Sequence, residues 1–299
     1  ILNVYKEKGY TSHDVVAKLR GIIGQKKIGH TGTLDPAAEG VLPVALGKGT
    51  RLVELLTEKE KTDEAVLRLG VSTDTQDMTG AVLSEKPVTV TEEEVREAVG
   101  SFVGEQLQIP PMYSALKVNG KKLYELAREG KTIERKPRPV VFYEIRILDM
   151  ELPLVRISVT CSKGTYIRTL CNDIGEKLGC GAAMASLVRT QVDRFQLEDA
   201  LTLERIEALQ KENELQPFIL PVDQLFEYYD KIVVADKAIC YLQNGNKINA
   251  GFCQGNIPGE DGKKVRMYDT KDSFYAIYRW DAGQNVFVND KMFFPHTEA

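Results

Sequence analysis

The sequence lacks the residue patterns that bind metals or build disulfide frameworks. Its 299 residues include only five cysteines and three histidines. No two cysteines have the Cys-x-x-Cys spacing that brings two thiolates to one zinc ion. The histidines, His13, His30 and His296, are too scattered along the chain to complete a metal site. We therefore expect a reduced, cytoplasmic protein without a structural metal.

Long hydrophobic runs are also missing. No stretch approaches the ~20 consecutive apolar residues of a membrane-spanning helix, so no membrane segment is expected. Residues 1–9 lack the basic and then apolar layout of a signal peptide. The chain begins with Ile1 instead of Met, so we expect at least one residue before it. A content of 43% hydrophobic and 27% charged residues excludes wholesale disorder, a coiled coil and collagen.

The charges are unevenly distributed. The formal net charge is −4, yet residues 117–138 contain eight basic and three acidic side chains, a local net charge of +5. A second basic run, residues 18–27, contains Lys18, Arg20, Lys26 and Lys27 and no acid. An acidic protein with focused basic patches can bind a polyanion by releasing condensed counterions. Solvated helix faces or turns would give the same pattern.

Periodicity predicts helices mixed with antiparallel-type strands. Ser12 can cap a helix that Gly24 ends, and Thr91 with Glu94 forms the signature of a capping box. Residues 41–46 are typical of a buried strand in which Pro43 favours a sheet edge or a bulge. Further strands are predicted at 65–69, 140–147 and 154–160, a helix at 165–178, and short strands at 265–268, 274–278 and 286–288. This order favours an α+β fold over a parallel doubly wound sheet.

The glycine-rich loop GHTGTLDPAAEG, residues 29–40, is the strongest candidate for chemistry. Its three glycines let the backbone approach a ligand closely, and Pro36 biases Asp35 toward an extended conformation. Asp35 is therefore a carboxylate on a rigid loop, suited to act as a nucleophile or general base. The alternative is a turn in which Asp35 only accepts hydrogen bonds from nearby amides.

Two phosphate-binding motifs fail on spacing. The run GKGT at 47–50 resembles the end of a Walker A loop, but Leu42 stands where the first glycine belongs. The run TGTL at 31–34 resembles the phosphorylated loop of P-type ATPases, but Gly29 and His30 replace its Asp-Lys pair. Neither nucleotide site is expected.

Five collinear motifs together resemble the TruB-type tRNA pseudouridine synthases, the pseudouridine-55 enzymes of bacteria. The first is GHTGTLDPAAEGVLPVALGKGTR at 29–51. The others follow in family order: LG at 69–70 with TDTQD at 73–77, QIPPMYSALK at 108–117, GKKLY at 120–124, and CSKGTYIRTL at 161–170 with GCGA at 179–182. The tail matches more loosely, resembling a PUA-like RNA-binding module.

The resemblance implies a fold, a reaction and a partner. It implies a catalytic α+β domain with a mixed, largely antiparallel sheet at 1–225, a basic thumb insertion at 110–139, and a PUA-like β module at 226–299. The reaction converts a uridine in the T-arm of tRNA, position 55, to pseudouridine by flipping the base and forming a C-glycoside. It implies no cofactor, no metal, no membrane and a monomeric cytoplasmic enzyme.

The resemblance also assigns roles to residues. Asp35 matches the catalytic Asp, and Arg168 matches the Arg that pairs with it and lowers its pKa. The remaining substrate-binding positions, which include a base contact, an apolar wall under the uracil and a residue that fills the space left by the base, are His30, Asp63, Asp77, Tyr166 and Leu187. The thumb cations expected to bind RNA phosphates are Lys117, Lys121, Lys122, Arg128, Lys131, Arg135 and Lys136.

One position departs from the family pattern. A Tyr that stacks on the target base is expected at position 63, where this chain has Asp63, two residues after Lys61. An Asp cannot stack, and a second carboxylate near Asp35 would push one of the two toward protonation. We therefore hypothesise retained tRNA binding with impaired catalysis. The rival interpretations are a tRNA-binding folding chaperone without catalysis and a glycosidase with paired carboxylates, which the basic thumb disfavours.

Overall fold

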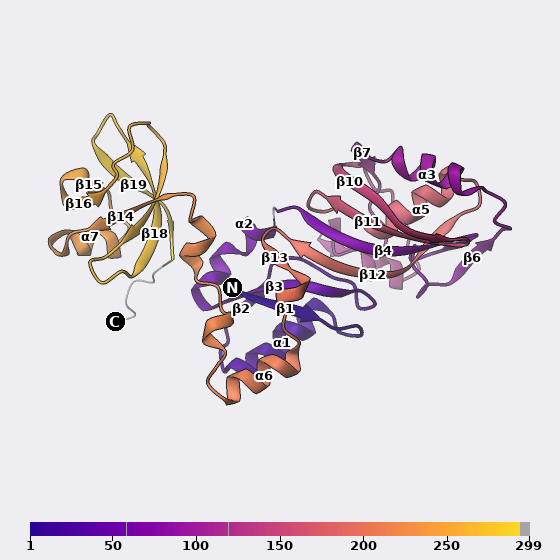
Figure 1. Ribbon diagram of the computed structural model, residues 1–299, viewed down its shortest axis with the longest axis horizontal. Helices are drawn as coiled ribbons and strands as arrows, with labels where there is room; N and C mark the ends of the chain where they lie inside the picture. The colour runs from indigo at the N-terminus through magenta and orange to yellow at the C-terminus, as the bar shows by residue number, and fades with distance from the viewer. Residues whose placement is uncertain (58, 119, 294–299) are drawn as a thin grey trace.

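The computed structural model describes residues 1–57, 59–118 and 120–293. It has two parts, each built around its own sheet (Figure 1). A nine-stranded sheet organises the larger part, and a six-stranded sheet organises residues 230–293, called the C-terminal module below. His296 lies outside the described residues.

The nine-stranded sheet has the order β1-β3-β12-β4-β11-β10-β7, with β2 paired to β3 and β13 paired to β12. Its strands are β1 (Leu2–Lys6), β2 (Ile28–His30), β3 (Glu39–Leu46), β4 (Lys61–Leu69), β7 (Gly104–Gln108), β10 (Arg138–Glu151), β11 (Leu154–Cys161), β12 (Ala182–Val192) and β13 (Phe195–Gln196). Every pairing is antiparallel except that of β3 with β12. The prediction of a mixed, largely antiparallel sheet in an α+β fold is confirmed.

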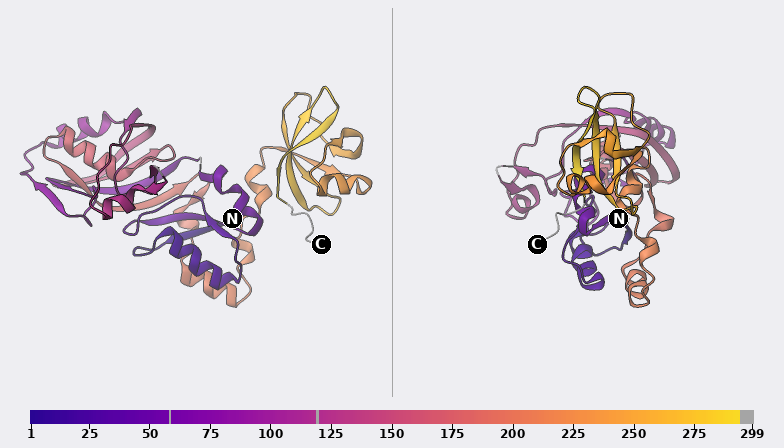
Figure 2. Two further views of the ribbon diagram at one scale, coloured as in Figure 1. Left: turned by 180° about the vertical axis from the view of Figure 1, so that it is seen from behind. Right: turned by 90° about the vertical axis from the view of Figure 1, so that its left-hand side faces the viewer.

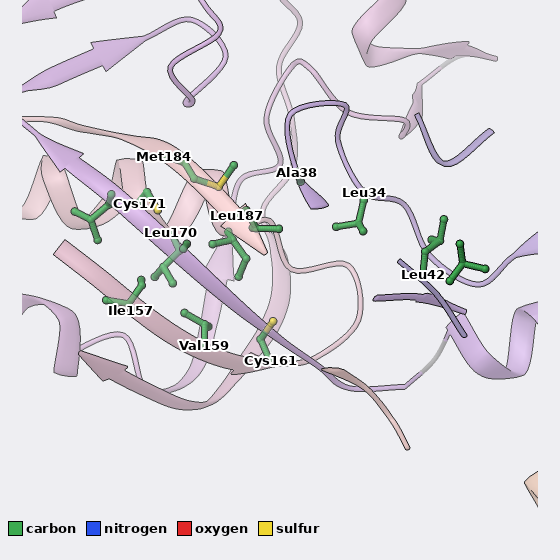
Figure 3. Close-up of a cluster of buried hydrophobic side chains, with 14 of the residues drawn as sticks. Leu34, Ala38, Leu42, Ile157, Val159, Cys161, Leu170, Cys171, Met184 and Leu187 are labelled. Carbon is green, nitrogen blue, oxygen red and sulfur yellow. The ribbon is translucent and has the colours of Figure 1, made fainter. Parts of the chain in front are cut away.

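The helices of the larger part pack against this sheet and against each other. They are α1 (Ser12–Ile23), α2 (Val53–Thr57), α3 (Glu92–Gly100), α4 (Leu123–Arg128), α5 (Ile167–Lys177) and α6 (Leu203–Lys211). Figure 1 shows α3 and α5 over the half of the sheet that contains β4, β10 and β11, and α1 beside α6 near β1 and β3. The apolar faces of α1, α3, α5 and α6 join the strands in one continuous core, part of which is drawn in Figure 3.

Local sequence signals explain where α1 begins and ends. Gly24 ends the helix in the left-handed conformation, as predicted. The N-cap is Thr11, not Ser12, and it forms a capping box with Asp14. Ser12 is instead buried, and its hydroxyl accepts a hydrogen bond from the Leu34 amide at 3.0 Å. The start of α1 therefore fastens the glycine-rich loop.

The prediction that Pro43 marks a sheet edge or a bulge is wrong, because β3 lies between β1 and β12 and its register with β1 has no shift. β12 pairs only with Glu39 and Gly40, and β2 only with residues 44–46, so Pro43 falls between the two contacts on that side of β3. Its carbonyl accepts the Thr31 amide at 3.1 Å. An interior strand tolerates proline here because no ladder hydrogen bond needs a donor at this point.

The C-terminal module contains the short strands predicted near the chain's end. Their order is β15-β19-β18-β17-β14-β16, a strongly curved mixed sheet consistent with a PUA-like module. The elements are β14 (Asp230–Val234), α7 (Ile239–Gln243), β15 (Ile248–Asn249), β16 (Cys253–Gly255), β17 (Lys264–Tyr268), β18 (Phe274–Asp281) and β19 (Val286–Met292). A separate cluster of buried side chains, which includes Met267, Tyr278 and Phe287, forms its core.

A third apolar cluster joins the two parts. It brings Ile1 and Leu52 of the larger part together with Phe226, Ile277 and Phe293. Figures 1 and 2 show the C-terminal module beside the end of the larger part where the N-terminus lies. The short pairs β5 (Val71–Thr73) with β6 (Val82–Glu85), and β8 (Lys117–Val118) with β9 (Lys121–Lys122), complete the strands.

Candidate active site around Asp35

The glycine-rich loop connects β2 to β3 and is held at several points. Leu34 and Ala38 are buried, and the Pro36 carbonyl accepts the Gly9 amide at 2.8 Å. The Ala38 amide donates to the Asp35 carbonyl at 3.0 Å, which closes a turn around Pro36. The backbone on both sides of Asp35 is thus fixed, while the Asp35 side chain remains 39% exposed.

Asp35 pairs with an arginine and not with the turn. Arg168 Nε lies 2.8 Å from Asp35 Oδ2, and the arginine side chain is only 5% exposed. Within the described residues, the Asp35 carboxylate accepts no hydrogen bond from a backbone amide. The alternative in which Asp35 merely caps a turn is therefore wrong, and the carboxylate is aimed by a buried guanidinium.

Arg168 connects three segments that are distant in sequence. Nη1 donates to the Thr75 carbonyl at 3.0 Å, and Nη2 donates to the Tyr113 carbonyl at 2.9 Å. Tyr113 lies at the root of the thumb insertion, and Thr75 lies in the turn that follows β5. One side chain, positioned in the first turn of α5, thus links the loop of Asp35 to both.

The two carboxylate oxygens of Asp77 make different contacts. Oδ1 accepts hydrogen bonds from the Thr75 hydroxyl at 2.8 Å and the Thr79 amide at 2.9 Å, as expected for a turn carboxylate. Oδ2 lies 3.9 Å from Arg168 Nε. The structure therefore places Asp77 in the charge network of Arg168 and in the turn at the same time.

Tyr166 and Leu187, the two further predicted base-pocket residues, come from two different elements. Tyr166 is the N-cap of α5, half-buried, and its backbone amide and carbonyl both bond the Gln108 side chain, at 2.8 and 3.0 Å. Burial raises the pKa of Tyr166, so its hydroxyl stays protonated at neutral pH. Leu187 on β12 is buried in the apolar cluster that also contains Leu170 (Figure 3).

His30 ends β2 at the entrance to the loop. Its ring meets the ring of His13 edge-on, with centroids 5.0 Å apart. Burial, and secondarily the charge of His13, lowers the pKa of His30 below its ordinary value of 6.5. His30 is therefore a neutral, half-buried ring at physiological pH.

Asp63 does not act on Asp35 as its charge alone suggested. It is fully buried in β4, and its two oxygens pair with Arg189 Nε at 2.9 Å and Lys61 Nζ at 2.6 Å. Burial on its own would raise the pKa of Asp63, but the charges of Arg189 and Lys61 outweigh it and lower the pKa. The expected competition between two carboxylates is wrong, because two cations already neutralise Asp63.

Arg189 reaches the glycine-rich loop as well. Its Nη1 donates to the Thr33 carbonyl at 3.4 Å, and β12 pairs with β3 at Arg189 and Gly40. Gly40 has a φ of +109°, and a Cβ there would lie 2.2 Å from the Arg189 carbonyl oxygen. The last glycine of the loop is thus required by the close approach of these two strands.

Lys6 is a site residue that the sequence analysis missed. Its side chain is fully buried beneath the loop, and Nζ donates to the carbonyls of Ala38 at 2.5 Å and Glu7 at 3.2 Å. Burial lowers the pKa of Lys6 to about 8, although the charge of Asp35 opposes the shift. The match of this lysine to the family pattern was the only signal that could have identified it, and it was weak.

The predicted thumb cations lie between β7 and β10, on β8, β9, α4 and the chain that follows. Most are exposed, and the side chains of Lys117 and Lys136 make no hydrogen bond or ion pair within the described residues. Others have local partners: Lys131 pairs with Glu129 at 2.7 Å, and Arg135 donates to the Pro110 carbonyl at 3.0 Å. Lys121, Lys122 and Arg128 complete the set, the last two beside the ring of Tyr124.

Outside residues 58, 119 and 294–299, no three His, Cys, Asp or Glu side chains are grouped so that they could hold a metal ion. In the same part of the chain, no helix is long and apolar enough to cross a membrane.

Comparison with known sequences identifies close relatives. Residues 20–167 match the family model of the TruB family pseudouridylate synthase N terminal domain, and residues 168–227 match that of the tRNA pseudouridylate synthase B C-terminal domain. The chain is 53% identical to the tRNA pseudouridine synthase B of Lachnoclostridium phytofermentans, covering 98% of this chain and 99% of that protein. It is 47% identical to the protein of that name from Clostridium novyi, covering 93% and 94%.

Comparison with solved structures gives a consistent result. A crystal structure of a Cbf5-Nop10-Gar1 complex contains a chain with a TM-score of 0.71 and 29% identity, covering 99% of this chain and 85% of that one. An H/ACA RNP bound to a substrate RNA containing 2′-deoxyuridine contains a chain with a TM-score of 0.70 and 27% identity, at the same coverage.

Proposed function

The chain belongs to the TruB family and is a tRNA pseudouridine synthase, and from this premise we propose which uridine it modifies and how. Its target is the uridine at position 55, in the T-arm of tRNA. The protein acts as a monomer in the cytoplasm, with no cofactor. The observation that carries the proposal is the half-exposed Asp35 carboxylate held 2.8 Å from the buried Arg168 guanidinium.

The reaction rearranges the bonds of one nucleotide. The bond between ribose C1′ and uracil N1 breaks, the base turns, and a bond forms between C1′ and C5. The proton on C5 is lost and N1 ends with a proton, so the product is an isomer of the substrate. Asp35 meets the ribose, either as the nucleophile at C1′ or as the base that takes the C2′ proton on a glycal route, and Arg168 aims the carboxylate.

The base must leave its stack to reach Asp35. Extrusion costs a few kcal/mol in unstacking and unpairing, which contacts in the pocket must offset. Tyr166 contacts the flipped base, Leu187 forms an apolar wall beneath the uracil, and the neutral ring of His30 fills the space left behind. Asp77 supports Arg168 in the same network.

The thumb insertion supplies affinity for the T-arm without reading its sequence. Its exposed cations bind backbone phosphates, which makes the affinity depend strongly on salt. Arg168 donates to the Tyr113 carbonyl at the thumb root. The side chain that orients Asp35 therefore also contacts the segment that closes over the T-arm.

The substitution Asp35→Asn tests this assignment. We expect the variant to bind a T-arm hairpin with unchanged affinity and to release no tritium from [5-³H]uridine, because the amide can neither attack C1′ nor carry negative charge. Release at the wild-type rate by Asp35→Asn would refute the catalytic role. A circular dichroism melt serves as the control for folding.

The second candidate, a tRNA-binding chaperone with impaired catalysis, is favoured by one observation. Asp63 is fully buried and held by Lys61 and Arg189, so the side chain at this position presents no ring to the target base. Loss of base stacking is worth ~1–3 kcal/mol, or roughly 5- to 150-fold in turnover. We expect Asp63→Tyr to turn over the hairpin faster than the natural chain by a factor in this range. Equal turnover would show that Asp63 does not impair the enzyme.

A further inference from the structure

A large basic pocket lies outside the Asp35 site, at the joint between the larger part and the C-terminal module. Its volume is about 800 Å³, and it is bounded by the end of α1, the start of β2, the 3₁₀ turn at Gly47–Leu52 and β19. Five of its lining residues are cationic: Arg20, Lys26, Lys27, Arg51 and Lys291. Three of them belong to the second basic run of the sequence, which the proposed active site leaves unused.

The cations of this pocket are not neutralised by the protein. Within the described part of the chain, none of the five forms an ion pair with a carboxylate. Arg20 and Arg51 donate to the backbone carbonyls of Ile28 and Met292, at 3.4 and 2.7 Å, and keep their full charge. In a chain with a net charge of −4, five unpaired cations around one pocket mark a binding site for a polyanion.

The pocket has a fixed shape because the two parts are joined beside it. Arg51 of the larger part bonds the Met292 carbonyl of β19, one residue from Lys291. The apolar cluster that contains Leu52 and Phe293 lies under the same joint. The backbone that carries Lys291 is therefore joined to the part that carries Lys26 and Lys27, which reduces the entropy lost when a ligand binds between them.

The pocket is close to Asp35. Gly29 lines it, and Asp35 follows six residues later, so their Cα atoms are at most ~20 Å apart. At ~3.4 Å per nucleotide along a strand, this distance corresponds to about six nucleotides or fewer. One RNA molecule whose target nucleotide lies at Asp35 can therefore also contact the pocket.

We propose that this pocket binds backbone phosphates of the tRNA substrate, outside the loop that carries the target uridine. The proposal rests on the proposed function, because it assumes that the tRNA occupies the Asp35 site. Recognition is by charge, so it is independent of base sequence. The pocket joins the C-terminal module to substrate binding through Lys291, and it gives the basic run at 18–27 a role.

The test compares two triple variants of equal charge. Lys26→Ala/Lys27→Ala/Lys291→Ala removes three pocket cations, and the control Lys211→Ala/Lys247→Ala/Lys271→Ala removes three exposed lysines elsewhere. The dissociation constant for unmodified tRNA is measured from 50 to 300 mM KCl. We expect the pocket variant to lose about tenfold or more in affinity, and its slope of log K against log[salt] to become shallower by about 2–3. The control variant should match the wild type.

Three outcomes would overturn the proposal. These are an unchanged affinity and slope in the pocket variant, an equal loss in both variants, and binding of inorganic phosphate at the pocket of the wild type with no change in tRNA affinity on substitution. The last result would identify a site for small anions. A wild type that binds tRNA but releases no tritium would instead count against the proposed function and leave the binding comparison valid.

Discussion

Arg168 Nε lies 2.8 Å from Asp35 Oδ2 while both terminal nitrogens of the same guanidinium bond backbone carbonyls. The Thr75 carbonyl comes from the turn after β5, and the Tyr113 carbonyl comes from the thumb root. All three guanidinium nitrogens of Arg168 are therefore engaged, so these contacts hold the side chain in one rotamer. The position of the carboxylate depends on the geometry of the guanidinium, not on its charge alone.

Arg168→Lys should consequently behave as a loss of positioning. A lysine keeps the positive charge but cannot bond the carboxylate and two carbonyls at once. We expect kcat for hairpin tritium release to fall about 10²-fold, because a misplacement of ~1 Å has an effect of this size. The matched control is Arg156→Lys, an exposed arginine paired with Glu64, which should leave kcat unchanged. A kcat within threefold of wild type for Arg168→Lys would show that the guanidinium geometry is not needed to position Asp35.

The buried pair Asp63–Arg189 should show strong coupling in stability. Arg189→Met leaves a carboxylate of zero exposure with Lys61 as its only partner, and we expect a loss of about 3–5 kcal/mol in the free energy of unfolding. Asp63→Asn in the same background should recover part of that loss, because the remaining buried charge is removed.

Urea unfolding of the two single variants and the double variant gives the coupling energy. The exposed pair Lys211–Glu207 on α6 is the control, with an expected coupling of about 0.3–0.5 kcal/mol. Equal coupling in the two pairs would show that Asp63 and Arg189 do not form a buried ion pair in solution.

Acid should destabilise the protein partly through Asp63. Although burial opposes it, the pairing with Arg189 and Lys61 lowers the folded-state pKa of Asp63 below its ordinary value of 3.8. A carboxylate with a depressed pKa stabilises the fold above the ordinary value, and this contribution is lost as the pH falls through the folded-state value. We expect the wild type to lose more stability than Asp63→Asn below about pH 4. Parallel stability curves for the two proteins down to the acid transition would contradict the shift.

The elements with local signals were predictable from the sequence. Gly24 ends α1, and Thr91 with Glu94 begins α3, since capping depends on residues within one helical turn. The central strand β12 was not predicted. Its sequence AAMASLVRTQV does not alternate clearly, because Leu187 and Arg189 both face the interior and the arginine is made tolerable by Asp63.

The site, like the fold, has residues that could be predicted from the sequence and contacts that could not. Asp35 and Arg168 could be named from the family resemblance, but their contact joins residues 133 positions apart, which no local pattern reports. Asp63 was expected to oppose Asp35 because its partner Arg189, 126 residues away, could not be seen from the sequence. Lys6 was passed over because its match to the family pattern is weak, and the carbonyls that bury it become neighbours only after folding.

Lys6 provides a test in which activity and stability separate. Lys6→Met keeps the volume of the side chain but removes the donor to the Ala38 carbonyl, which helps to close the turn around Asp35. We expect kcat to fall while KM for the hairpin changes little, because Lys6 is buried beneath the loop and touches no RNA. Lys8→Met, an exposed lysine two residues away, is the control and should match the wild type.

The stability of the same variants should depend on pH in a defined direction. The folded-state pKa of Lys6 is about 8 against an ordinary value of 10.5, so protonation favours the unfolded chain. Between these two values the wild type should gain stability relative to Lys6→Met as the pH rises, by up to about 3 kcal/mol. Lys8→Met should follow the wild type across the range. If the difference between wild type and Lys6→Met stays constant from pH 8 to 10.5, then Lys6 is not held as a buried amine with a lowered pKa, and its place beneath the Asp35 loop would have to be abandoned.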